Sequence, residues 1–159
     1  MSQAMPMSDG IVGFQVWSDG SCIGNPGPGG YAAIAFDPDG NELAVVTGRE
    51  KRSTNQRMEM LAAAEGLAQL PLSVEVTVCT DSKYVVDGMT SWIFGWKRRG
   101  WKKADGEPVK NLELWQRLDR EVSGRRVKWR HVRGHVGIEL NERCDKLANE
   151  QARIAKSGE

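Results

Sequence analysis

The order of hydrophobic patterns along the chain is the strongest constraint on its fold. Alternating patterns typical of strands come first and are then interleaved with stretches of helical periodicity. Strands are expected at Phe14–Ser18, Tyr31–Phe36, Glu42–Thr47, Val74–Thr80 and Val127–Val132. Helices are expected at about Gln56–Leu70, after Asp81-Ser82, at about Ser91–Arg99, at Asn111–Val122 and from Glu139 to about Ala155. Three strands followed by alternating β and α units predict an α/β fold with a mixed sheet and helices packed on it.

Turn-forming residues mark the boundaries of these elements. A Gly/Pro-rich turn is expected over Gly24–Gly30, and Asp37-Pro38-Asp39-Gly40 predicts a hairpin because Pro fixes φ and Gly accepts positive φ. Ser53-Thr54-Asn55 supplies capping side chains for the first helix, and Pro71 is expected to end that helix. A polar loop is expected over Gly100–Pro108.

The length of the chain, 159 residues, suits one domain. That domain is expected to span residues 13–155, with a flexible segment before it at 1–12 and a frayed end at 156–159. Apolar residues make up 40% of the chain and charged residues 27%, which is typical of a globular protein and not of a disordered one. No apolar run approaches the roughly 20 residues of a membrane span, so no membrane partner is expected.

The cysteines and the charge bear on compartment and partners. Three widely spaced cysteines argue against a disulfide framework, and Met1–Gly10 lacks the pattern of a secretory signal, so a cytoplasmic location is expected. The net charge is only +1, but five cations crowd one short stretch: Lys97, Arg98, Arg99, Lys102 and Lys103. Such a cluster indicates phosphate contacts, although cations on a helix commonly just face water.

Four acidic residues stand out by their positions: Asp19, Glu59, Asp81 and Asp145. Asp19 and Asp81 are placed at or near the ends of predicted strands, where sites gather in open α/β sheets. Taken singly, each has an ordinary structural explanation. Asp81-Ser82 has the chemistry of a helix cap, Glu59 can compensate a helix dipole, Asp145 can be a solvated surface charge and Asp19-Gly20 can be a turn.

The motifs around these residues resemble those of type 1 ribonuclease H. The similarity runs from about residue 13 to residue 150, in the order and spacing of that family. The matching motifs are Asp19–Tyr31, Thr54–Glu59, Thr80-Asp81-Ser82, Gly134-His135 and Asn141–Asp145. The resemblance implies the ribonuclease H-like fold, a five-stranded mixed sheet with helices on both faces. It also implies hydrolysis of the RNA strand of RNA–DNA hybrids.

By this resemblance, Asp19, Glu59, Asp81 and Asp145 are the catalytic and metal-binding carboxylates. Four converging carboxylates repel one another unless cations neutralise them, and Mg²⁺ prefers oxygen ligands. Two Mg²⁺ ions are expected during catalysis, with Mn²⁺ as a substitute, and the products are expected to carry 5′-phosphate and 3′-hydroxyl ends. A monomer is expected. A catalytically silent hybrid-binding module of the same fold is the alternative.

Two histidines fall near the end of the predicted fifth strand. His131 lies within the strand pattern and is interpreted as structural. His135 lies in what reads as a flexible loop, and the resemblance implies that it assists proton transfer or product departure. A zinc site formed by His131 and His135 is disfavoured, because no clear cysteine pair accompanies them.

The resemblance also identifies residues that meet the hybrid. Those near the metals are Gly24, Asn25, Thr54, Asn55 and Gln56, several of which also have turn-forming or capping chemistry. The stretch Trp92–Trp101 resembles the basic protrusion with which bacterial members hold the DNA strand. Its predicted contacts are Lys97, Arg98, Arg99, Lys102 and Lys103, supported by Trp96 and Trp101.

Overall fold

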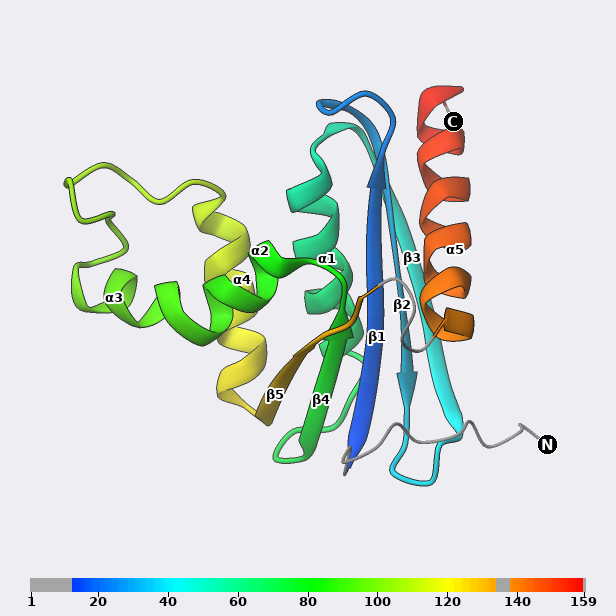
Figure 1. Ribbon diagram of the computed structural model, residues 1–159, viewed down its shortest axis with the longest axis horizontal. Coiled ribbons are helices and arrows are strands. Elements are labelled where there is room, and N and C mark those ends of the chain that lie inside the picture. The colour runs from blue at the N-terminus through cyan, green and yellow to red at the C-terminus, as the bar shows by residue number, and fades with distance from the viewer. Residues whose placement is uncertain (1–12, 134–137, 159) are drawn as a thin grey trace.

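A single mixed sheet of five strands runs through the molecule in the computed structural model, which describes residues 13–133 and 138–158. The strands are β1 (Phe14–Cys22), β2 (Gly27–Phe36), β3 (Glu42–Ser53), β4 (Glu75–Thr80) and β5 (Arg126–His131). Their order across the sheet is β3-β2-β1-β4-β5 (Figure 1). The first three strands pair antiparallel, whereas β4 pairs parallel with both β1 and β5. The predicted mixed sheet is confirmed.

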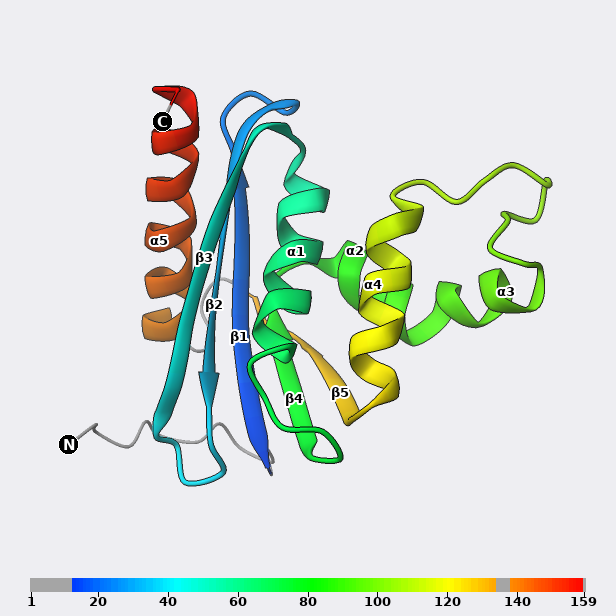
Figure 2. The ribbon, with the colours of Figure 1, turned by 180° about the vertical axis from the view of Figure 1, so that it is seen from behind.

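Helices cover both faces of this sheet, as predicted. They are α1 (Asn55–Leu67), α2 (Lys83–Asp87), the π-helical segment η1 (Gly88–Trp92), α3 (Ile93–Arg98), α4 (Leu112–Ser123) and α5 (Ile138–Lys156). Figures 1 and 2 show α5 against one face, α1 against the other, and α3 with its following loop projecting away from the sheet. None of these helices, over the part of the chain that is described, is both long and apolar enough to cross a bilayer.

The sheet divides the core into two layers because neighbouring residues of a strand point to opposite faces. Val16 belongs to the larger cluster, which includes residues of α1 and α4. Trp17 belongs to the smaller cluster, together with Phe36 and with Cys144 of α5. Strand β1 is therefore buried on both sides, and its polar residues are held in a fixed setting.

Three strands extend beyond their predicted ends. β1 continues from Ser18 to Cys22 because its pairing with β2 runs on to Cys22 and Gly29. β2 correspondingly starts at Gly27, so the prediction of a turn over all of Gly24–Gly30 is wrong for its second half. β3 reaches Ser53 and follows β2 along the same length. The glycines suggested a loop, but long-range pairing places them in a strand.

Two helical predictions also need correction. Helix α1 ends at Leu67 and not at Leu70, because the amides of Gln69 and Leu70 bond to carbonyls only three residues back, in a tight turn that precedes Pro71. The two separate helical pieces predicted after Asp81 form a consecutive series, α2, η1 and α3. The predictions for 1–12 lie outside the described residues, as does that for Glu159 within the expected frayed end.

Candidate active site

Asp19 lies in the body of β1 and is buried, with 6% of its surface exposed. Its Oδ1 accepts a hydrogen bond from the amide of Gly20 over 2.9 Å. The pairing between β1 and β4 ends at Ser18 and Thr80, so Asp81 is the first residue of its chain segment beyond the paired strands. The parallel register of β1 and β4 therefore places Asp19 and Asp81 side by side.

Glu59 comes from α1, which starts at a defined cap. The Oγ1 atom of Thr54 accepts from the amide of Arg57 over 3.1 Å, and Glu59 follows in the second turn. Glu59 lies beyond the first turn, so dipole compensation is a poorer explanation for it than its sequence position suggested. A Cβ on Gly20 would lie 2.5 Å from the carbonyl carbon of Met58, so only glycine permits this approach of α1 to β1.

The structure brings the carboxylates together. Oxygens of Asp19, Glu59 and Asp81 all lie within 4.8 Å of one another. Asp145, on α5, is exposed, and it lies close enough to Asp19 to raise the pKa of the Asp19 carboxyl. Four acids from β1, α1, the end of β4 and α5 thus meet at one place, with Asp145 as the most peripheral member.

Burial and mutual repulsion raise the pKa values of these acids. Burial, followed by the charges of Asp81 and Asp145, raises the pKa of Asp19 to about 8. Burial and the charge of Asp81 raise the pKa of Glu59 to about 7, and burial with the charge of Asp145 raises the pKa of Asp81. A cluster of carboxyl groups with raised pKa values suits a divalent cation such as Mg²⁺. The cation prefers oxygen ligands, and its positive charge offsets the repulsion between the carboxylates.

His131 contacts the site from the end of β5. Its Nε2 lies 3.1 Å from the carbonyl oxygen of Asp81, and its side chain is exposed. The strand pattern suggested a purely structural residue and carried no signal for this contact. His135 lies outside the described residues, and within them no group of metal-ligating side chains includes His131.

The predicted hybrid contacts near the carboxylates meet at the start of α1. Gly24 and Asn25 lie in the exposed turn after β1, and the amide of Asn55 donates to Asn25 Oδ1 over 3.1 Å. Thr54 caps the helix. Gln56 lines a cavity of about 200 Å³, which is also lined by Tyr84, Trp92, Trp96, Trp115 and Lys103. This cavity therefore places Gln56, at the start of α1, beside the tryptophan-rich segment.

The basic protrusion consists of α3 and the loop after it, which stand out from the body of the protein (Figure 2). Its five cations are all exposed, but they differ in their contacts. Lys97 pairs with Asp119 over 3.1 Å, Lys103 pairs with Asp105 over 3.8 Å, and the Nε of Arg99 donates to the carbonyl of Lys102. Trp96 packs against Trp92 and Trp115, which anchors the protrusion.

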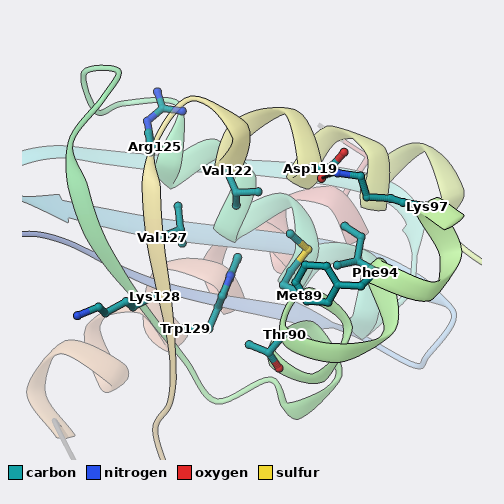
Figure 3. A pocket seen from close by; sticks show the side chains of 11 residues that line it. Met89, Thr90, Phe94, Lys97, Asp119, Val122, Arg125, Val127, Lys128 and Trp129 are labelled. Carbon is teal, nitrogen blue, oxygen red and sulfur yellow. Dashed lines mark hydrogen bonds and ion pairs between the residues drawn. The ribbon is translucent and has the colours of Figure 1, made fainter.

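A groove of about 690 Å³ lies between the η1–α3 segment, α4 and β5, and Lys97 is one of the residues that line it (Figure 3). Met89, Val127 and Trp129 contribute an apolar lining, and 54% of the Phe94 surface is exposed at this groove. The four carboxylates do not line it. The groove is therefore separate from the candidate active site.

Fold and site together define a class, the ribonuclease H-like proteins. The family model described as RNase H matches residues 13–153. Ribonuclease H of Pseudomonas savastanoi pv. phaseolicola is 51% identical over 90% of this chain and 93% of its own length. Ribonuclease H of Bordetella bronchiseptica is 49% identical over 89% of this chain and 90% of its own length.

Solved structures agree with these relatives. LC9-RNase H1, a type 1 RNase H with the type 2 active-site motif, is 35% identical with a TM-score of 0.77, over 93% of this chain and 76% of that protein. LC11-RNase H1, solved in complex with an RNA/DNA hybrid, is 25% identical with a TM-score of 0.68, over 89% of this chain and 98% of that protein. The chain belongs to the RNase H family, and it is an enzyme of the bacterial type 1 group.

Proposed function

We propose that this enzyme hydrolyses the RNA strand of RNA–DNA hybrids and leaves 5′-phosphate and 3′-hydroxyl ends. The observation that carries the proposal is the convergence of oxygens of Asp19, Glu59 and Asp81 within 4.8 Å of one another, with Asp145 close enough to raise the pKa of Asp19. Support also comes from the related LC11-RNase H1, whose structure contains an RNA/DNA hybrid. Relatives that are about half identical carry the name ribonuclease H.

The four carboxylates are proposed to hold two Mg²⁺ ions, with Mn²⁺ as a substitute. When bound, the ions supply positive charge and Lewis acidity at the scissile phosphate. The carboxylates of Asp19, Glu59 and Asp81 provide the inner oxygen ligands, and Asp145 approaches from α5. Burial of Asp19 makes its bare charge unfavourable, so cation binding is strongly coupled to ionisation of the cluster.

His135 is proposed to assist proton transfer or product departure during the reaction. Its imidazole titrates near neutral pH when unperturbed, so it can give a proton to the departing 3′ oxygen or assist product departure. His135 lies outside the described residues, and the proposal rests on the family motif around it.

The hybrid is proposed to lie across two surfaces, the start of α1 with the turn after β1, and the basic protrusion. Gly24, Asn25, Thr54, Asn55 and Gln56, in the turn after β1 and at the start of α1, are proposed to meet the hybrid there. A hybrid has a wide, shallow minor groove with 2′-hydroxyls on one strand, so shape and 2′-OH contacts distinguish RNA from DNA. Cations of the protrusion hold phosphates of the DNA strand, supported by Trp96 and Trp101.

A cytoplasmic monomer is proposed as the working form. All three cysteines are free thiols. Burial raises the pKa values of Cys79 and Cys144 to about 12, which keeps both as inert thiols. Free thiols suit a reducing compartment.

The test is cleavage of an end-labelled RNA–DNA hybrid with Mg²⁺, beside RNA and DNA duplexes of the same sequence and an EDTA control. Cutting of the RNA strand of the hybrid alone, only with metal, is the expected result. Product ends are read by their response to phosphatase and to ligation. Tight hybrid binding without cutting at any Mg²⁺ or Mn²⁺ concentration would overturn the proposal and favour a silent binding module.

A further inference from the structure

Helix α5 is tied to β1 by a row of polar contacts. Trp17, Asp19 and Ser21 alternate along β1, and residues two apart in a strand point to the same face. The thiol of Cys144 donates to the carbonyl of Trp17 over 3.4 Å. Asp145 lies close enough to Asp19 to raise its pKa, and the hydroxyl of Ser21 donates to Oδ1 of Asn149. Three alternate positions of β1 thus face the middle of α5.

Both the oxygen and the nitrogen of the Asn149 side-chain amide form hydrogen bonds in this row. Its Oδ1 accepts from Ser21, and its Nδ2 donates to Oδ2 of Asp145 over 3.2 Å. Asn149 lies one helical turn after Asp145, so the two side chains share a face of α5. The amide therefore links the Asp145 carboxylate to a strand residue two positions from Asp19.

The separation between α5 and the sheet is fixed at the same level. Gly30 of β2 pairs with Ser21, and a Cβ on Gly30 would lie 2.5 Å from the amide nitrogen of Ala152. The helix backbone therefore rests directly on the strand beside Ser21. This close packing gives the Ser21–Asn149 contact a rigid frame.

Asp145 needs such support more than Asp19 and Glu59 do. Asp19 is buried and Glu59 is half-buried, whereas Asp145, like Asp81, is exposed. An exposed carboxylate has rotamer freedom that a ligand position must remove, and outer hydrogen bonds commonly orient metal ligands.

We propose that Asn149 is a positioning residue that holds the Asp145 carboxylate for cation binding, anchored by the hydroxyl of Ser21. Asn149 itself contacts neither substrate nor cation. This inference rests on the proposed function, because it assumes that Asp145 is a ligand.

The test compares Asn149→Ala and Asn149→Asp with the parent enzyme. Asn149→Asp keeps an oxygen that accepts from Ser21 but replaces the donor to Asp145 with a second negative charge. Glu150→Gln is the control, since it makes a carboxyl-to-amide exchange at the adjacent exposed position. Ser21→Ala releases the anchor but leaves the donor to Asp145.

Mg²⁺ affinity of the free protein, measured by calorimetry without substrate, is the main readout. Both Asn149 variants are expected to bind Mg²⁺ about tenfold more weakly, as for other outer hydrogen bonds to metal ligands. Ser21→Ala should lose less Mg²⁺ affinity than the Asn149 variants, and the Mg²⁺ affinity of Glu150→Gln should match that of the parent. The thermal midpoint of Asn149→Ala in EDTA should stay at the parent value, and the Mg²⁺ concentration for half-maximal cleavage should rise with the dissociation constant.

The outcomes separate this inference from the proposed function. Parent-like Mg²⁺ affinity in both Asn149 variants, with the parent binding Mg²⁺ and cutting hybrids, would overturn the positioning role alone. A lower midpoint in EDTA with unchanged affinity would make Asn149 a structural contact and would also overturn it. A parent that neither binds Mg²⁺ nor cuts would overturn the proposed function and this inference with it.

Discussion

Gly20 of β1 lies so close to Glu59 of α1 that no side chain fits between them. A Cβ at Gly20 would overlap the amide nitrogen of Glu59 and would lie 2.8 Å from the Cβ of Met58. The contact fixes how near α1 comes to β1. It therefore sets the separation between the carboxylates of Glu59 and Asp19, which belong to the same cluster.

Gly20→Ala should push α1 away from β1. We expect a loss of about 1–3 kcal/mol in the free energy of unfolding, because overpacking at a backbone contact forces a shift. Cleavage should fall more than tenfold even below the unfolding transition, since misplacement of a catalytic group by about 1 Å costs up to roughly 100-fold. Urea unfolding and hybrid cleavage check the two effects.

Gly95→Ala is the matched control. Gly95 lies in α3, and a Cβ there would meet only the guanidinium end of Arg99, at 3.1 to 3.4 Å. A flexible side chain can move, so this change should stabilise the protein by about 0.5–1 kcal/mol through helix propensity. If Gly20→Ala proved as harmless as Gly95→Ala, the contact between Gly20 and α1 would not set the separation between the carboxylates of Asp19 and Glu59.

Without metal, the stability of the enzyme should fall as pH rises from about 5 to 8.5. The folded pKa values of Asp19 and Glu59, about 8 and about 7, lie above those of unfolded carboxyls. The folded state therefore binds more protons than the unfolded state in this window, and each ionisation inside the fold lowers the free energy of unfolding. Urea unfolding in EDTA at several pH values measures the slope.

Asp19→Asn should flatten this slope and raise stability at pH 8.5 by about 1–2 kcal/mol, as relief of a strained functional site commonly does. The amide keeps an oxygen that accepts from Gly20. Saturating Mg²⁺ should likewise raise the free energy of unfolding of the parent at high pH. A stability in EDTA that rises with pH over this range would contradict the electrostatic account of the cluster.

The basic protrusion should contribute to the salt dependence of hybrid binding. Replacing Lys97, Arg98 and Arg99 together with Gln should weaken binding and reduce the slope of log K against log salt by about 2–3, since each phosphate contact contributes roughly 0.7–0.9. Arg98 should matter more than Lys97, which already pairs with Asp119 over 3.1 Å. Fluorescence anisotropy with a catalytically inactive background measures the slope.

A variant with the same loss of charge elsewhere controls for net charge. Arg153 and Lys156 lie in the last turn of α5, and Arg126 is exposed at the start of β5. Gln at these three positions should leave the slope near the parent value. Equal slopes for the two triple variants would contradict a binding role for the protrusion and would show that its cations only face water.

The sequence predicted the sheet well because the alternation of a strand is a local pattern, whereas the roles of the four acids come from the family resemblance and stay a prediction. Alternation predicted five strands, and the motif around Asp81-Ser82 predicted a strand end followed by a capped helix, which the Ser82 cap confirms. The bounds of β1 and β2 were wrong because Gly27–Gly30 has turn-forming composition. Only its pairing with β1 makes that segment a strand.

Other features depend on residues far apart in the chain and have no local signal. The contact of His131 with the carbonyl of Asp81 spans two strands. The link from Ser21 to Asn149 requires the packing of α5 on the sheet, which composition does not encode. The ion pair between Lys97 and Asp119 likewise distinguishes one cation of the protrusion from its neighbours only in three dimensions.

The most direct test of the central claim is hybrid cleavage by Asp19→Asn beside the parent and Asp39→Asn, all with saturating Mg²⁺. Asp39 lies in the exposed hairpin turn, so it receives the same substitution away from the cluster. The account predicts that Asp39→Asn cuts like the parent. Asp19→Asn should remain folded and bind the hybrid but cut at least about 1000-fold more slowly, a loss of about 4 kcal/mol. Cleavage by Asp19→Asn within tenfold of the parent would remove Asp19 from the metal site and contradict the account.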